Sequence, residues 1–367
     1  MKARPKLIPS AWSESPVDRR SVLLGAAAVG GFLTLHLGAV AYARGPVGSG
    51  GRLTPQAFID AFQRVNGIHR GFRRNHAKGV SVTGYFESNG NGAELSKAAV
   101  FRRGRTTVVG RFSLPGGNPT VADTAKANRG LALAFGYPES GQWRTAMLNI
   151  PVFTVNSPQG FYDQLLASKP VGDTGKPDPE AMAQFMAAHP ETARATKVIK
   201  AAPPTSGFAD STYRGLSAFL FVSATGKVTP VRWALVPMQP VSAPGAPGRG
   251  PNWMFDNLIT AIRKNPLRWR LMLTVGEPQD NLTDATQAWP PERRVIDAGT
   301  VVLDAVDSER RGNARDINFD PLVLPDGIQP SDDPLLTTRS AVYAASFRRR
   351  AGESGSMPAV ETSEVSQ

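Results

Sequence analysis

Short segments with a period of two dominate the first half of the chain and limit the folds open to it. Apolar and polar residues alternate over 80–86, 106–112, 131–135 and 144–148, with Gly, Pro and Asn turns between them. Residues 99–101 are expected to form a further short strand. Alternation is typical of strands with one buried face. Short strands at regular spacing predict an antiparallel barrel or sandwich.

Helices are expected around these strands. Thr54 and Pro55 supply a cap and a first helical residue for a helix over 53–65. Further helices are predicted at 161–168, 179–189, 190–201 and 253–264, and a short one within 334–350. Further strands are predicted at 217–222, 228–237, 269–275 and 299–303. The expected fold class is therefore α+β: an antiparallel barrel or sandwich with surrounding helices.

The N-terminus has the pattern of a targeting segment. Residues 1–20 form a basic tail that ends in Arg19-Arg20, and residues 21–43 carry no formal charge. The second stretch is long enough to cross a bilayer. It is either a twin-arginine-type signal, cleaved near 41–43, or an uncleaved N-terminal transmembrane anchor, and a buried core helix is the third alternative. Both membrane alternatives place the rest of the chain outside.

Composition narrows the possible chemistry. The chain contains no cysteine, which excludes disulfides, thiolate metal sites and a cysteine nucleophile. Its net charge of +12 favours anionic ligands. The basic residues are scattered and no nucleic-acid motif is present, so no nucleic-acid partner is expected. Residues 44–52 read as a flexible Gly-rich linker, and the tail at 351–367, which is poor in core-forming residues, is expected to be disordered.

Histidine is scarce, and each one can be weighed separately. His36 lies in the apolar N-terminal segment, and His189 precedes a proline at a helix end, which favours a surface position. His69 and His76 bracket a basic segment, and His76 lies just before the first strong strand. Taken without other information, a histidine at such a place is structural more often than catalytic.

Residues 73–87 resemble the distal-histidine motif of the haem catalase superfamily. The family pattern R-x-x-H-A-K-G corresponds to residues 73–79, and G-Y-F-E corresponds to residues 84–87. Four further segments agree in the family's order, and the resemblance covers about residues 53–350. These segments are 111–113, 123–130, 141–153, and 339–343 with the trailing Arg350.

The resemblance implies a catalase-type barrel that binds haem b. It assigns Tyr343 as the iron ligand, with Arg339 one helical turn earlier to stabilise the phenolate, whose ordinary pKa is near 10. It also assigns His76 as the distal proton shuttle for peroxide, oriented by Ser113. The haem propionates would pair with arginine, and aromatic rings would flank the haem, although ordinary core packing is an equal alternative for the rings. These positions are Arg73, Arg111 and Arg350 for the propionates, and Phe153 and Phe161 for the rings.

The chain departs from the family at the distal amide. The family has an asparagine where this chain has Leu148, and Asn149 follows. Either Asn149 takes over as the distal donor, displaced by one residue, or the donor is missing. Catalase turnover requires a second peroxide to be held there, so the sequence resembles the compact, exported catalase-related peroxidase branch.

The leading hypothesis is therefore an exported or membrane-anchored peroxidase that reduces peroxide with small organic electron donors. A true catalase, a haem enzyme that rearranges lipid hydroperoxides, and a basic tethered binding module are the alternatives. The sequence does not identify the physiological donor or the oligomeric state.

Overall fold

The computed structural model describes residues 53–172, 175–242, 248, 250–355 and 357–365. The predicted basic tail, apolar segment and linker all fall within residues 1–52 and lie outside the described residues.

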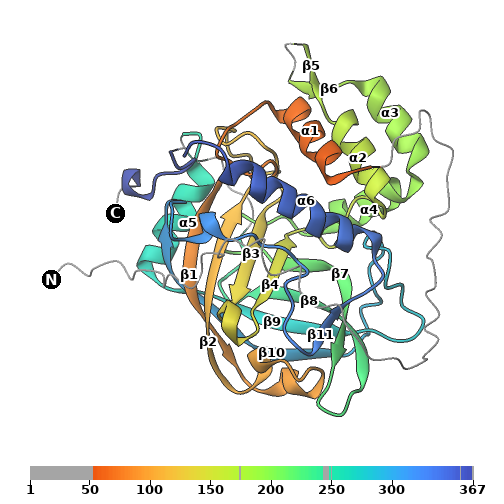
Figure 1. Cartoon of the computed structure of the whole chain (residues 1–367), viewed down its shortest axis with the longest axis vertical. Coiled ribbons are helices and arrows are strands. Elements are labelled where there is room, and N and C mark those ends of the chain that lie inside the picture. Colours follow the sequence, from red (N-terminus) through yellow and green to blue (C-terminus); the bar gives the residue numbers. More distant parts are fainter. Residues whose placement is uncertain (1–52, 173–174, 243–247, 249, 356, 366–367) are drawn as a thin grey trace, which may run out of the picture.

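The strands build a closed antiparallel barrel (Figure 1). Eight of them follow one another in the order β7-β4-β3-β2-β1-β10-β9-β8, and β8 pairs with β7 to close the ring. β11 extends the sheet beside β7, and β5 pairs with β6 in a separate hairpin. The strands are β1 Gly79–Ser88, β2 Gly104–Ser113, β3 Gly130–Phe135, β4 Trp143–Leu148, β5 Pro170–Val171, β6 Lys176–Pro177, β7 Tyr213–Val222, β8 Val228–Pro237, β9 Leu267–Val275, β10 Val295–Asp307 and β11 Ile328–Pro330.

The helices lie on the outside of the barrel, and α6 crosses its β1–β4 side in Figure 1. Thr54 accepts a hydrogen bond from the Ala57 amide at the start of α1, and Asp333 caps α6 in the same way. In both helices a proline occupies the first turn, where its missing N–H costs nothing. The helices are α1 Pro55–Asn66, α2 Pro158–Ala167, α3 Pro179–Ala188, α4 Pro190–Ala201, α5 Trp253–Lys264 and α6 Pro334–Ala351.

Aromatic side chains fill the barrel interior. Trp143 stacks on Phe135 at a centroid distance of 4.9 Å and meets Trp233 edge-on at 5.1 Å. All three side chains are almost fully buried. Because successive side chains of a strand point to opposite faces, the residues between these inward-facing ones are available to the outer face.

The outer face of β2 and β3 carries a second apolar layer. Phe112 packs into the interior, and its neighbours Arg111 and Ser113 are buried too, because α6 and the loop before it cover this side of the barrel. Tyr343 of α6 packs against the apolar cluster on this face. The buried members of that cluster are Val109, Ala134, Ala314, Ile317 and Phe319.

The structure corrects three predictions of local structure. Residues 99–101 form a 3-10 turn and not a strand, with Val100 and Phe101 both buried. The helix within 334–350 is not short, since α6 has 18 residues. The tail is not disordered over the described residues, since Val360 is buried and Thr362 hydrogen-bonds Ser308.

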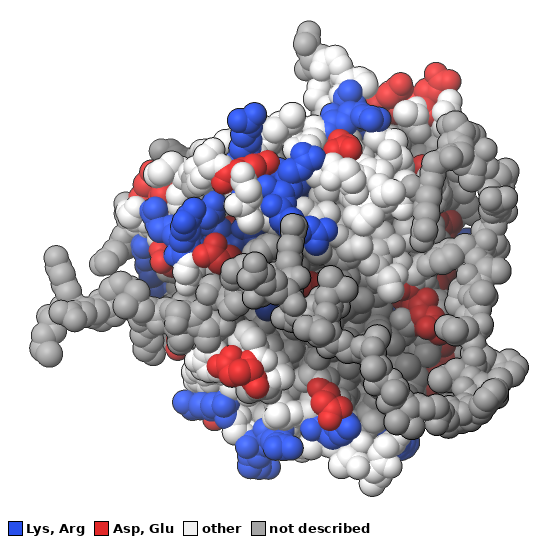
Figure 2. Space-filling model, viewed as in Figure 1, with Lys and Arg blue, Asp and Glu red and all other residues white. Residues whose placement is uncertain are grey.

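Positive charge gathers at one end of α6. Figure 2 shows Lys and Arg side chains grouped over the region where Figure 1 draws the C-terminal part of this helix. Three successive arginines occupy its last turn, where they also interact favourably with the helix dipole. Arg348 and Arg349 are exposed, whereas Arg350 is buried. Within the described residues, no helix combines the length and apolar character needed to cross a bilayer.

Candidate active site

A cavity of about 370 Å³ lies between the outer face of the barrel and the helices α1, α2 and α6. Nine of the ten candidate site residues predicted from the sequence line it, although they come from five separate segments of the chain. These nine are Arg73, His76, Arg111, Ser113, Phe153, Phe161, Arg339, Tyr343 and Arg350. The tenth, Asn149, is not among the lining residues.

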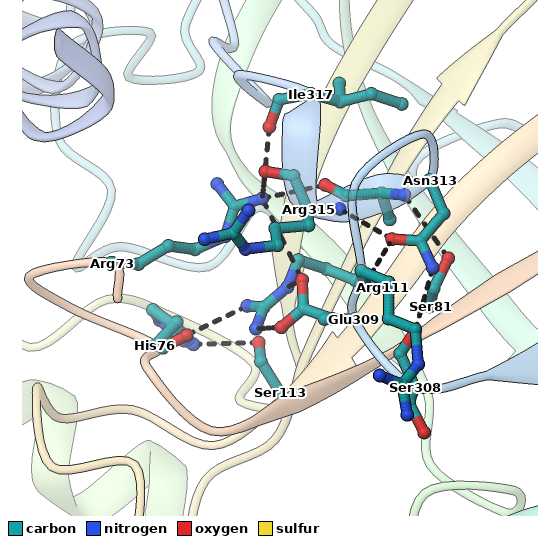
Figure 3. Close-up of polar contacts among 12 residues, drawn as sticks. Arg73, His76, Ser81, Arg111, Ser113, Ser308, Glu309, Asn313, Arg315 and Ile317 are labelled. Carbon is teal, nitrogen blue, oxygen red and sulfur yellow. Dashed lines mark hydrogen bonds and ion pairs between the residues drawn. The ribbon is translucent and has the colours of Figure 1, made fainter. Parts of the chain in front are cut away.

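His76 is held in an unusual backbone conformation on one wall. Its φ of 57° lies in the left-handed region, where it is the one residue other than glycine among those described. Its amide donates to the Asn75 side chain at 3.0 Å, and its Nδ1 lies 3.0 Å from Ser113 Oγ (Figure 3). Such strain persists where surrounding contacts over-determine the conformation and is often found at functional sites.

The imidazole of His76 is kept neutral. Burial, followed by the positive charges of Arg111, Arg73 and Arg339, lowers its pKa to about 3. The ring lies directly over Gly130, where an added Cβ would be 3.1 Å from two ring atoms. Because Nδ1 faces Ser113, the second ring nitrogen, Nε2, is the atom suited to exchange a proton with a ligand in the cavity.

Lys78, two residues after His76, fixes the motif to the rest of the fold. Its ammonium group is buried and contacts Asp123 at 2.7 Å and the carbonyl oxygens of Val121 and Pro251. Asp123 in turn accepts hydrogen bonds from the amides of Met254 and Phe255 at the start of α5. This lysine therefore has a structural role that explains its place in the motif.

Arg111 and Arg73 converge on the carboxylate of Glu309 (Figure 3), and Arg350 adds a third positive charge near it. Glu309 receives two hydrogen bonds from Arg111, at 2.9 and 2.6 Å, and lies 4.0 Å from Arg73. Arg73 also donates to the carbonyls of Ala314 and Ile317. Burial opposes ionisation of Glu309, but Arg111, Arg73 and Arg350 hold its pKa below the ordinary value.

Two nitrogen atoms of Arg350 in this cluster could donate hydrogen bonds to an anionic ligand. Nε and Nη2 of Arg350 are buried and make no hydrogen bond within the part of the chain that the structure describes. Burial lowers the pKa of Arg350 to about 10, and burial together with Arg350 and Arg111 lowers the pKa of Arg73. An uncompensated buried cation is costly. A ligand that brings carboxylates to this edge would relieve the cost, which fits the propionates of haem.

The opposite wall is formed by α6. Arg339 and Tyr343 lie one turn apart on the cavity side of this helix, with the guanidinium carbon 5.9 Å from the centre of the phenol ring. Arg339 also donates to the Ala146 carbonyl at 3.3 Å, which ties it to β4. The predicted spacing of four residues therefore produces the expected juxtaposition.

Phe153 and Phe161 line the cavity from the side of α2. Their ring centroids are 5.8 Å apart, and Phe161 also contacts Phe58 and Phe62 of α1. The two rings thus serve both as cavity wall and as packing between helices. The sequence left open whether these rings flank a haem or pack in the core, and their positions are compatible with both.

Of the two alternatives that the sequence leaves open for the distal amide, a replacement by Asn149 is not supported by the structure. Its side chain accepts a hydrogen bond from the Arg129 amide at 2.7 Å. Leu148 and Ile150 line the cavity, whereas Asn149, in the bend that follows β4, does not. Sequence reasoning overlooked Asn128, which lines the cavity, and Glu309.

The His76–Ser113 pair and Tyr343 of α6 line the same cavity beside the barrel. The chain belongs to the catalase family, whose family model, described as Catalase, matches residues 47–363. A catalase-related peroxidase from Synechococcus elongatus is 39% identical over 81% of this chain and 89% of its own length. One from Mycolicibacterium paratuberculosis is 33% identical over 82% of this chain and 96% of its own length.

Larger catalases are more distant. A catalase from Pseudomonas aeruginosa is 29% identical over 76% of this chain, which spans 57% of that protein. The solved structure of catalase A from Saccharomyces cerevisiae superposes with a TM-score of 0.70 at 22% identity, covering 85% of this chain and 68% of that one. This likeness supports the fold. Because catalase-family proteins bind haem, haem is the cofactor expected for the cavity.

Proposed function

We propose that the protein is a haem b-dependent peroxidase that reduces hydrogen peroxide or organic peroxides with small organic electron donors. The observation that carries this proposal is the placement of the neutral His76–Ser113 pair and of Tyr343 with Arg339 around one cavity. The names of the two most similar relatives reported above, both catalase-related peroxidases, support the same activity.

Each group has a defined task in this proposal. Tyr343 would bind the iron, Arg339 would favour the phenolate form, and the unpaired nitrogens of Arg350 would hold a propionate. The haem supplies the redox-active iron. His76 takes a proton from one peroxide oxygen and returns it to the other, so that water is the leaving group. Ser113 holds the ring in position for both transfers.

Leu148 favours a peroxidase over a catalase. It lies opposite Gly130 in the β3–β4 ladder, and Gly130 contacts the His76 ring, so the leucine occupies the same region of the cavity wall. Its apolar side chain offers no hydrogen bond to a second peroxide, and Asn149 faces away. An organic donor, which needs no such amide, can therefore compete for the oxidised enzyme.

Absorbance spectroscopy and two variants test the proposal. The purified or reconstituted protein should show a haem Soret band, and Tyr343→Phe should lose or weaken it. His76→Ala should keep the band and lose oxidation of a dye by peroxide. Protein that stays colourless after reconstitution contradicts the scheme, and dye oxidation by His76→Ala at the parent rate contradicts the proton shuttle.

We further propose that the enzyme acts in the periplasm or another extracytoplasmic space, exported or anchored through residues 21–43. The support is the arginine pair before this uncharged stretch. Cell fractionation with N-terminal sequencing of the mature protein tests this: an uncleaved cytoplasmic product is the opposing result.

A further inference from the structure

Glu309 lies where it can act on His76 through a single intermediate side chain. Nε and Nη2 of Arg111 donate to its two carboxylate oxygens, and Nη1 of Arg111 donates to the His76 carbonyl at 2.9 Å (Figure 3). All three guanidinium nitrogens are thus engaged, two by the carboxylate and one by the histidine backbone. The side chain of Arg111 is 3% exposed and that of Glu309 is 11% exposed.

The surrounding structure is shaped to this connection. Arg111 lies over Gly79, where an added Cβ would come within 2.2 Å of its Nη2, so any larger residue would displace the guanidinium. The Glu309 backbone is bracketed by Asn313, which donates to the Ser308 carbonyl and accepts from the Arg310 amide. Both ends of the ion pair are therefore fixed before any ligand binds.

The Glu309–Arg111 pair contacts His76, whose backbone conformation is strained. His76 adopts a left-handed backbone, which is strained in a residue with a side chain. Its amide is held by Asn75, its ring by Ser113 and its carbonyl by Arg111. The contact with the His76 carbonyl requires the Arg111 guanidinium to keep one orientation. A carboxylate that accepts two hydrogen bonds fixes a guanidinium in one orientation.

We propose that Glu309 is a positioning residue for the distal histidine, holding His76 in its working orientation through Arg111. This inference rests on the proposed peroxidase function. Removal of the carboxylate leaves Arg111 free to rotate, which releases the His76 carbonyl and loosens the geometry of the ring against Ser113.

The test compares Glu309→Gln with Asp280→Asn. The amide places a donor against Arg111 and loses one of the two bonds. Asp280 is a matched control, because it forms the same bidentate pair with Arg293, at 2.8 and 2.9 Å, and neither residue lines the cavity. Glu309→Asp keeps the charge with a shorter reach and serves as the second variant if the amide variant does not fold.

The first readout is the tautomer of His76 in the haem-free full chain labelled with ¹⁵N-histidine. The sequence has four histidines, so His76→Ala assigns the signal. The parent and Asp280→Asn should show one neutral tautomer, whereas Glu309→Gln should show an averaged signal and Glu309→Asp a partial shift. Parent-like His76 signals in both Glu309 variants overturn the inference.

The second readout is the rate at which cyanide binds the haem-loaded protein, since hydrogen cyanide must transfer its proton to a distal base. The rate should fall about tenfold in Glu309→Gln, the equivalent of one hydrogen bond to a charged group, and should stay at the parent value in Asp280→Asn. Equal rates in Glu309→Gln and the parent also overturn the inference. If no variant or parent binds haem, the proposed function fails, and the tautomer signals still decide the role of Glu309.

Discussion

Substitution of Gly130 by alanine adds a single methyl group, which should be enough to disrupt the contact between His76 and Ser113. The new Cβ would lie 2.9 Å from Ser113 Oγ and 3.1 Å from Nδ1 and Cε1 of His76. Gly130 pairs with Ser113 on one side and with Leu148 on the other, so the strand has no room to retreat. The imidazole and the serine hydroxyl must therefore move apart.

The size of the effect follows from the contacts. Overpacking of this kind costs about 1–3 kcal/mol of unfolding free energy. A displacement of about 1 Å in a catalytic group lowers the rate about 10²-fold. We therefore expect kcat/KM for peroxide to fall about 10²-fold in Gly130→Ala. Ser113→Ala removes the hydrogen bond without adding bulk, so it should cost about 1 kcal/mol, or about fivefold.

The assay is the rate of donor oxidation by peroxide in haem-loaded protein, with urea unfolding measured in parallel. Gly207→Ala is the control, because its new Cβ would meet nothing closer than Met254 Cγ at 3.8 Å. It should retain the parent rate within about twofold and unfold at the same urea concentration or slightly higher, since alanine reduces the entropy of the unfolded chain. If Gly130→Ala also stays within about twofold of the parent rate, close packing around His76 does not govern activity and the reasoning is refuted.

Three further predictions concern pH, the distal amide and the C-terminal tail. His76 gains a proton near its ordinary pKa of 6.5 in the unfolded chain, and near pH 3 in the folded chain. Its contribution to the free energy of unfolding is therefore complete above pH 6.5 and is lost as the pH falls toward 3. Urea unfolding should show a shallower acid dependence in His76→Ala, and parallel curves would contradict the low pKa. Leu148→Asn should raise oxygen evolution relative to dye oxidation. An unchanged ratio would show that Leu148 does not favour peroxidase over catalase activity. Val360→Ala should lower the unfolding free energy by about 1–2 kcal/mol because its side chain is buried, as a urea titration would show; no change would mean that the tail does not pack in solution.

Regular patterns made much of the fold predictable. The predicted bounds of α4, α5 and β8 match the structure at both ends, because prolines, turns and clear periodicity mark them. Short alternating strands predicted a barrel or a sandwich, and the resemblance to catalases favoured the barrel. Residues 99–101 were misjudged because three residues are too few to show a period. The tail was misjudged because a few buried side chains sufficed to dock it.

The site was predictable where function leaves a local pattern. Arg339 and Tyr343 are one helical turn apart, and His76 lies in a long motif. These local patterns allowed a role to be predicted for each of the three residues. Glu309 contacts Arg111 across 198 positions of sequence, and no local pattern marks such a partner. Whether Asn149 replaces the missing amide could not be predicted, because the direction of a side chain at a strand end depends on register, which a one-residue shift reverses.

The most direct test of the peroxidase assignment is to measure oxygen evolved and donor oxidised by the same haem-loaded sample as it consumes hydrogen peroxide. With Leu148 in place of the distal amide, we predict that peroxide consumption is matched by donor oxidation with little oxygen released. Oxygen release in the stoichiometry of disproportionation, unaffected by added donor, would contradict the assignment and identify the protein as a catalase.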